Sequence, residues 1–202
     1  MTSEEIFGKN REIRQPGVDV MRENNPEMQA LFATMRSIGT GILAAALDKV
    51  QREKEEDPSA GIFVAKLDVP AIDIGGQSYA FYGARVLGKT AAGNQPFVTP
   101  HRHLIGDEPY LFREGTGEMN FGRVSESGDA VVWNKPVVVN VGDEFLIRQG
   151  EVHSFRNLGN ESVDFFFSCP ESHLQDHSET NPKGDRYIVK DLKNGVPPHF
   201  NG

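Results

Sequence analysis

The sequence predicts an all-β domain of antiparallel strands, preceded by an α-helical N-terminal arm. Beyond residue 60, short β-rich runs alternate with turns rich in glycine, asparagine and aspartate, as in an antiparallel sandwich or barrel. Before residue 60, apolar residues recur at three- and four-residue steps, as on one face of a helix. We expect a helical arm at 1–60, a β-barrel at 61–170, and a C-terminal tail at 171–202 that packs on the barrel or forms a lid.

The arm has a clear expected start. Asn25 is a favourable N-cap and Pro26 suits the first helical position. Gly39 and Gly41 weaken the middle, so the pattern allows a kinked helix or two helices. We interpret the apolar stripe as a face that packs on the domain or on a partner subunit. Its members are Met28, Leu31, Phe32, Met35, Ile38, Ile42, Ala46 and Val50.

The barrel region divides at its turns into short runs. The triple phenylalanine at 165–167 suggests a strand that is buried on both faces at a contact between subunits. The segment 185–189 ends apolar enough to rejoin the barrel or helix as an outer element. The predicted strands are 61–69, 78–88, 95–103, 108–114, 117–124, 130–141, 144–149, 152–157 and 162–168.

Composition excludes several functional classes. The net charge of −8 makes nucleic acid an unfavourable partner, because an acidic surface repels phosphate backbones. No apolar run is long enough to span a bilayer, so we expect no membrane partner. The first 17 residues lack the apolar region of a secretory signal, and a single cysteine, Cys169, fits a reducing compartment. We therefore expect a cytoplasmic protein.

One short segment collects metal-ligating side chains. His101 and His103 are two residues apart in a predicted strand, so both side chains project from one face. After a turn, Glu108 begins the next strand and can share that face. Neutral imidazoles and a carboxylate are ligands for first-row divalent metals. A further ligand can come from His153, which opens a strand after a turn at Gly150.

The spacing of these residues resembles the cupin family. Its first motif has the form His-x-His, three or four residues, Glu, six residues, Gly. Here His101 and His103 are followed after four residues by Glu108 and after six more by Gly115. The family's leading glycine, normally separated from the first histidine by five residues, is absent, and the nearest is Gly93, with seven residues between.

The second cupin motif runs Gly, five residues, Pro-x-Gly-x-x-His-x-x-x-Asn. Here Gly142 leads, Gly150 and His153 follow, and Asn157 closes the motif. Arg148 stands where the family usually has proline, which bears on the rigidity of the turn and not on the ligand set.

The resemblance covers roughly residues 61–168. It implies a small antiparallel double-stranded β-barrel, a jelly roll, in which His101, His103, Glu108 and His153 bind one divalent metal. It does not specify a reaction, because the family includes dioxygenases, decarboxylases, isomerases, epimerases, lyases and non-enzymatic binders.

The ligand set still bounds the chemistry. With three neutral imidazoles and one carboxylate, a divalent ion keeps a net charge of about +1, and a six-coordinate ion keeps two free positions. Such a centre attracts a small chelating anion, such as a keto acid, a hydroxy acid or a catecholate. A four-ligand set without thiolate suits Fe(II), Mn(II) or Ni(II) better than Zn(II).

Three functions follow as hypotheses. We favour a metal-dependent enzyme with Fe(II) dioxygenase or oxygenase chemistry on a small organic anion. The first alternative is an isomerase, lyase or decarboxylase that uses Mn or Ni as a Lewis acid, with Glu108 or Tyr110 in a catalytic role. The second is a small-molecule binder that holds metal without turnover. The expected substrate-binding wall comprises Phe97, Phe112, Phe155, Asn157 and Tyr82.

The remaining residues of interest have plainer interpretations. Tyr110 is as well explained by a core position as by a catalytic one. Cys169 is expected to be a small buried hydrophobic residue. His173, His177 and His199 lie in a polar tail and are expected to be solvated, with a lid as the lesser alternative. The apolar stripe of the arm and the phenylalanine strand need more cover than one small barrel gives, which predicts a homodimer.

Overall fold

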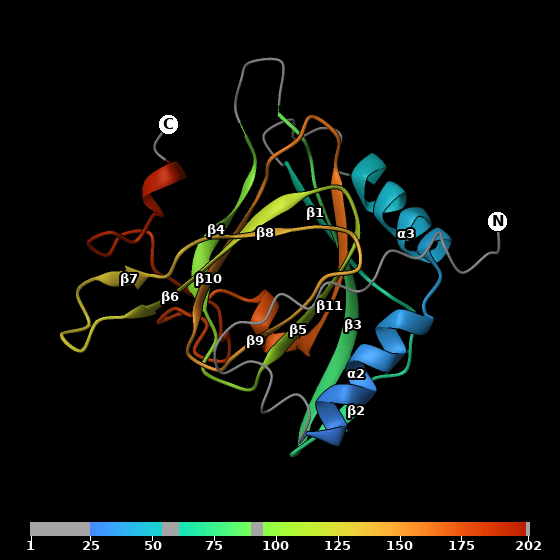
Figure 1. The fold of residues 1–202 in the computed structure, drawn as a ribbon. Helices are drawn as coiled ribbons and strands as arrows, with labels where there is room; N and C mark the ends of the chain where they lie inside the picture. Colours follow the sequence, from blue (N-terminus) through green and yellow to red (C-terminus); the bar gives the residue numbers. More distant parts are fainter. Residues whose placement is uncertain (1–24, 54–60, 90–94, 201–202) are drawn as a thin grey trace.

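Two antiparallel sheets and two helices form the molecule (Figure 1). The computed structural model describes residues 25–53, 61–89 and 95–200. The sheets face each other, and both helices lie against the outer face of one sheet. The predicted all-β class with a helical arm is therefore confirmed. In the described residues, the hydrogen-bonded ladders do not join the two sheets into a closed barrel, so the fold is a sandwich of two antiparallel sheets.

The described part of the arm forms two helices rather than one kinked helix, which confirms the second of the two expected alternatives. Asn25 Oδ1 accepts from the backbone N–H groups of Glu27 and Met28 at 3.1 and 3.2 Å, which caps the first helix as predicted. The helix axes meet at 81° next to Gly39, where the low helix propensity of glycine favours a break. The helices are α2 (Pro26–Ser37) and α3 (Thr40–Glu53).

The first sheet is six-stranded and is covered by the helices. Its order is β1 (Ile62–Lys66), β3 (Gln77–Val86), β11 (Val163–Pro170), β5 (Glu108–Glu114) and β9 (Glu144–Ile147), and β2 (Ile72–Ile74) pairs with β3. No prediction covered β2, which is a strand of only three residues.

The second sheet is also six-stranded. The predicted run 130–141 splits into two strands on either side of Pro136, because proline has no N–H to donate to a ladder. The expected outer element at 185–189 contributes β12, which pairs with β4. The order is β12 (Tyr187–Ile188), β4 (Phe97–Arg102), β10 (Val152–Asn157), β6 (Gly117–Val124) and β7 (Val131–Trp133), and β8 (Val137–Val139) pairs with β6.

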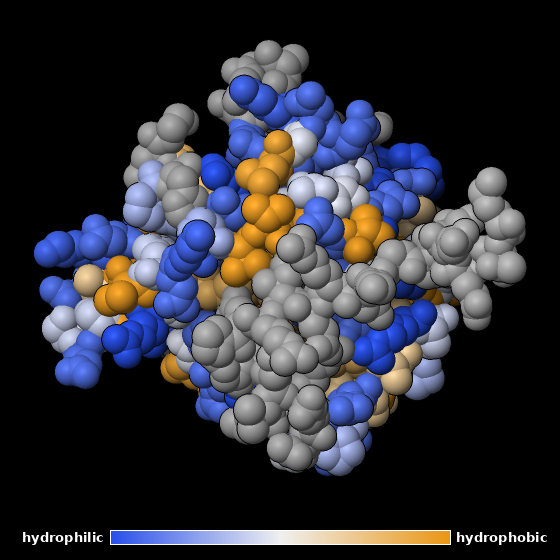
Figure 2. Space-filling model, in the orientation of Figure 1, coloured by the Kyte–Doolittle hydropathy of each residue, from blue (hydrophilic) through white to orange (hydrophobic). Residues whose placement is uncertain are grey.

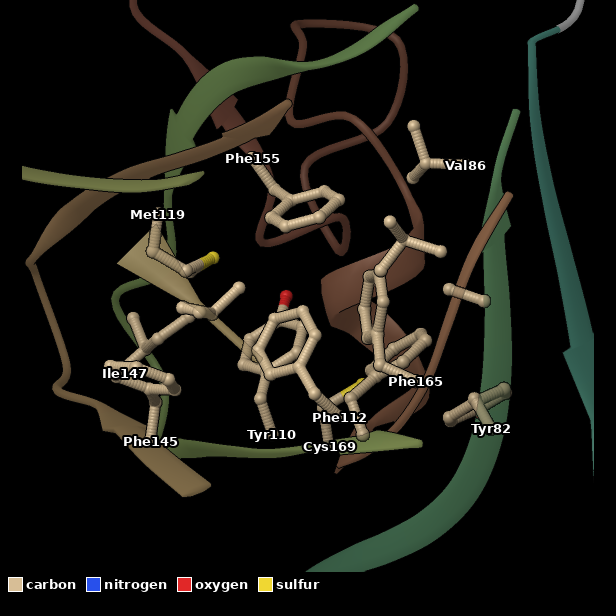
Figure 3. Close-up of a cluster of buried hydrophobic side chains, with 14 of the residues drawn as sticks. Tyr82, Val86, Tyr110, Phe112, Met119, Phe145, Ile147, Phe155, Phe165 and Cys169 are labelled. Atoms are coloured by element: carbon tan, nitrogen blue, oxygen red, sulfur yellow. The ribbon is translucent and has the colours of Figure 1, made fainter. Parts of the chain in front are cut away.

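An aromatic core fills the space between the sheets. Figure 3 shows Phe112, Phe155 and Phe165, from β5, β10 and β11, pointing toward one another. The ring centroids lie 5.4 Å apart for Phe112 and Phe155, and 5.1 Å apart for Phe112 and Phe165. Aromatic pairs at this separation attract each other beyond the effect of buried area, so this cluster fixes the spacing of the sheets.

The outer core lies between the helices and the first sheet. Phe165 and Phe167 point to the inner cluster, whereas Phe166 belongs to the cluster under the helices. The backbone approaches closely at Gly83 of β3, where an added Cβ would lie 2.3 Å from Leu43 of α3. The predicted strand with two buried faces is confirmed, and the chain's own helices cover its outer face.

The apolar stripe of the arm is buried within the chain. Met28, Phe32 and Met35 are at most 3% exposed, whereas Ile42 is 57% exposed. Cover from a partner subunit is therefore not needed for most of the stripe. Within the described residues, no single helix has the length and apolarity to cross a bilayer. Helices α2 and α3 together reach that length and apolarity, but they are bent by 81° at the break between them.

Candidate metal centre

The three motif histidines lie together between the two sheets. β4 carries His101 near its end, β10 carries His153, and the two residues are paired in the second sheet. His103 follows β4 directly, while Glu108 opens β5 of the first sheet. One ring nitrogen from each of the three histidines lies within 4.8 Å of the others. The structure thus brings together the three histidines predicted as metal ligands, and Glu108 lies beside two of them.

Two glycine turns position these residues. The chain reverses between His103 and Glu108 at Gly106, whose φ is +73°. Residues other than glycine rarely adopt this backbone conformation. Gly150, with φ of +82°, precedes His153, and its N–H donates to the carbonyl of His103 at 2.6 Å. This bond ties the loops of the two motifs to each other.

The missing proline of the second motif is replaced by hydrogen bonds. The carbonyl of Arg148 accepts from the N–H of Glu151 at 2.9 Å. The N–H of Arg148 donates to Oε2 of Glu151 at 3.2 Å. The turn before His153 is therefore closed at both ends by its own residues.

Each histidine is oriented by a backbone carbonyl. Nδ1 of His101 lies 2.7 Å from the carbonyl oxygen of Thr99, and Nδ1 of His103 lies 3.0 Å from that of Asp185. Nδ1 of His153 lies 3.4 Å from a third carbonyl oxygen, that of Glu151. Because a carbonyl only accepts, Nδ1 carries the proton and Nε2 keeps its lone pair. This is the arrangement that metal-ligating histidines adopt.

The free nitrogens face Glu108. Its Oε2 lies 3.5 Å from Nε2 of His103 and 3.5 Å from Nε2 of His153. Both of these nitrogens are buried and have no hydrogen-bond partner in the described residues. Buried polar atoms are rarely left unpaired, so these orphaned nitrogens beside a carboxylate fit a divalent cation.

Burial keeps the cluster uncharged. It lowers the pKa of His103 to about 2 and that of His153 to about 3, and it lowers the pKa of His101 well below the usual range. Burial also raises the pKa of Glu108 to about 8. The histidines are therefore neutral, which is the form that binds metal.

Tyr110 and Cys169 border the carboxylate. The Tyr110 hydroxyl donates to Oε2 of Glu108 at 3.3 Å, and burial raises its pKa well above the usual range, so it stays protonated. Cys169 is buried as expected, but its sulfur is also within 4.8 Å of Glu108 and of His173. Burial raises the thiol pKa well above its usual range, so this cysteine is a neutral neighbour of the centre.

A cavity of about 340 Å³ opens onto the cluster. This volume is at the small end of ligand-binding pockets. One part of the wall is polar and includes the ligands, and the remainder is apolar. Its lining residues include Val64, Val98, Thr99, His101, His103, Glu108, Tyr110, Phe165, Phe167, His173, Leu174 and Arg186.

Four of the predicted wall residues lie within the protein but do not line this cavity. Phe112 and Phe155 belong to the aromatic core, and Tyr82 stacks on Phe167 there at 5.2 Å. Asn157 closes a turn, since its Nδ2 donates to the carbonyls of Val86 and Glu161. These positions are explained by packing, and a contact with substrate stays a prediction.

Phe97 is the predicted wall residue nearest the surface. It is 37% exposed and packs on Phe200, with the ring centroids 5.0 Å apart. It too is outside the cavity lining. Tyr110 is the predicted catalytic residue, besides Glu108, that the structure does place in the lining.

The expectation that His173 is solvated is wrong. The residue is 1% exposed, and its ring stacks on that of His103 at 4.0 Å with an interplanar angle of 4°. Its Nε2 contacts the carbonyl of Ile105, and its buried Nδ1 has no hydrogen-bond partner in the described residues. His177 is exposed as expected, while the side chain of His199 lies outside the described part.

Asp185 was missed by the sequence reasoning. Its carboxylate accepts from the N–H groups of Leu104 and Ile105 at 3.0 and 2.8 Å, and its carbonyl orients His103. The residue is 2% exposed. The available signal was its place at the start of the segment expected to rejoin the barrel.

Comparison with known proteins gives loose structural likeness only. No protein-family model and no curated protein matches the sequence. Similar solved structures include cupin-domain proteins and enzymes. KdgF from a Halomonas species has a TM-score of 0.39 and 16% identity, over 57% of this chain and 84% of that one. A cupin-2 domain protein from Rhodospirillum rubrum has a TM-score of 0.39 and 16% identity, over 55% of this chain and 60% of that one. Oxalate decarboxylase from Lactobacillus farciminis has a TM-score of 0.41 and 16% identity, over 64% of this chain and 32% of that one.

Proposed function

We propose that this chain is a metal-dependent enzyme of cupin type that acts on a small chelating organic anion. The observation that carries the proposal is the pair of orphaned Nε2 atoms, on His103 and His153, that face Glu108. With His101, these residues would hold one divalent ion, Fe(II), Mn(II) or Ni(II), with Zn(II) less suited. When bound, the ion would polarise a chelated oxygen as a Lewis acid and, as Fe(II), would supply redox chemistry with dioxygen.

Oxygenase chemistry is the first candidate. The apolar part of the cavity, with Val64, Val98 and Phe165, excludes water from the space beside the ligands. The Tyr110 hydroxyl is kept protonated by its burial, and it can hold a substrate oxygen if its proton turns away from Glu108, to which it donates in this structure. Glu108 and Tyr110, the catalytic candidates of the sequence analysis, remain the proposed catalytic residues.

Proton-transfer chemistry, as in an isomerase, lyase or decarboxylase, is the second candidate. The observation that favours it is His173, a residue of the cavity lining whose buried Nδ1 has no hydrogen-bond partner in the described residues. A lone pair at this position can accept a proton from a bound substrate. The third alternative, a binder without turnover, has the same ligand set and is separated by assay.

Metal loading followed by turnover assays tests the proposal. Protein purified without chelator or affinity metal is expected to hold about one divalent ion per chain by elemental analysis. Oxygen uptake with Fe(II) and a panel of keto acids and phenols separates oxygenation from proton transfer, which consumes no oxygen. Protein that takes up none of Fe(II), Mn(II) and Ni(II) would refute the metal centre, and metal uptake without turnover of any panel compound would favour the binder.

A further inference from the structure

Arg186 brings a positive charge to the cavity. It directly precedes β12, and among the described lining residues it is the one lysine or arginine. The same cavity is lined by His101, His103 and Glu108, so Arg186 shares it with the candidate ligand cluster.

The backbone holds Arg186 in place. Its N–H donates to the carbonyl of Gln175 at 3.0 Å, and its carbonyl accepts from the N–H of His177 at 2.9 Å. The side chain is 30% exposed and its Nη1 lies 3.4 Å from Oδ1 of Asp176, whose side chain is 60% exposed. Ion pairs at such exposure contribute little to stability, so a ligand anion can replace Asp176 at low cost.

The surroundings favour an anion with an apolar body. The protein carries a net charge of −8, yet among the described lining residues of the cavity there is one arginine, Arg186, and no lysine. The cavity also has an apolar wall, which includes Ile62, Val64 and Phe165. An arginine fork matches the two oxygens of a carboxylate, and a cavity of about 340 Å³ suits a small molecule.

We propose that Arg186 forms a carboxylate-binding subsite in the cavity, so that the ligand is a small organic acid with a hydrocarbon or aromatic body. The carboxylate pairs with the guanidinium and the body lies on the apolar wall. The subsite itself needs no metal. That the remaining polar end of the ligand reaches the histidine cluster rests on the proposed function.

Matched pairs of acids and amides test the subsite. The probes are 3-phenylpropionate with 3-phenylpropionamide, and hexanoate with hexanamide, titrated by calorimetry into the full chain. Chelator-treated protein is used first, so that coordination to metal makes no contribution. Each acid should bind wild-type protein about tenfold or more tightly than its amide, the size expected for a charge-assisted hydrogen bond.

Three variants separate the subsite from general charge effects. Arg186→Gln should abolish the preference for acid over amide. Arg123→Gln removes the same charge from an exposed position on β6 and should keep it. Asp176→Asn frees the guanidinium and should strengthen acid binding. It leaves Arg186 intact, so it remains informative if Arg186→Gln fails to fold by circular dichroism.

The outcomes distinguish this inference from the proposed function. A preference that survives Arg186→Gln overturns the subsite, and so does the lack of any preference in wild-type protein. Elemental analysis of the same samples reports on the metal. If wild-type protein shows the acid preference but takes up no metal, the subsite stands and the metal enzyme fails. If the protein takes up metal but shows no preference for acid over amide, the metal centre stands and the carboxylate subsite fails.

Discussion

Single residues at the centre owe their state to burial. His103 and His153 are neutral because desolvation penalises the imidazolium form, and carbonyls on Nδ1 direct both Nε2 atoms to Glu108. The members of the candidate cluster could be predicted from the sequence, because two motifs with fixed spacing mark His101, His103, Glu108 and His153. His173 could not, because its partner His103 is 70 positions away in the chain and nothing in the local pattern of a polar tail indicates a long-range contact.

Replacing His153 with alanine should lower metal affinity by at least about tenfold while the fold persists. The change removes one nitrogen from the cluster, whereas the apolar strands that hold the sheets are untouched. His177→Ala is the matched control, because His177 is exposed and stacks on Tyr187 outside the cluster. Metal titration beside circular dichroism measures both. Parent-like metal binding in His153→Ala would show that the second motif is misassigned.

Replacing Asp185 with alanine should also weaken metal binding, by about tenfold, although Asp185 is not proposed as a ligand. Its carboxylate holds the N–H groups of Leu104 and Ile105, and outer partners that orient a ligand typically affect affinity to this extent. Asp176→Ala, an exposed aspartate of the same tail, should bind metal like the parent. The same metal titration reports the result, and equal affinities in the two variants would contradict a positioning role for Asp185.

The elements of the fold were largely predictable where local rules decide them. Asn25 and Pro26 mark the start of α2, and Gly39 marks its separation from α3. The position of the helices on the molecule was not predictable. It depends on Gly83 of β3, where the missing side chain leaves room for Leu43, and a lone glycine in a strand does not name its contact. The strand β2 was missed because three residues carry too little periodicity to detect.

Replacing Leu47 with alanine should lower the free energy of unfolding by about 2–5 kcal/mol. Leu47 lies on α3 and is fully buried at 0% exposure against the first sheet, so its removal leaves a cavity. Ile42→Ala on the same helix is the control, because Ile42 is 57% exposed and its change should stay within about 0.5 kcal/mol. Denaturant titration measures both. Equal effects would mean that α3 does not form part of the cooperative core.

The whole molecule presents a mixed surface. Figure 2 shows one face that is mostly hydrophilic, with hydrophobic side chains gathered in small groups. Exposed apolar residues include Val132, Val138 and Val141, and scattered residues of this kind are normal on a protein surface. The homodimer was predicted because the apolar stripe and the phenylalanine strand need cover. The helices and the first sheet cover each other within one chain, so this argument for a dimer no longer applies.

The homodimer stays a proposal, and its interface should not be the helical arm. Sedimentation velocity over a range of concentrations measures the assembly directly. If the dimer forms, Ile42→Asp should leave its dissociation constant unchanged, because the rest of the stripe already packs inside the chain. Phe32→Asp should instead unfold the protein, since Phe32 is 1% exposed and an isolated buried charge is strongly destabilising. A strict monomer at high concentration would rule out the homodimer. A dimer that dissociates on Ile42→Asp would place the interface on α3 and show that the arm does have a second partner.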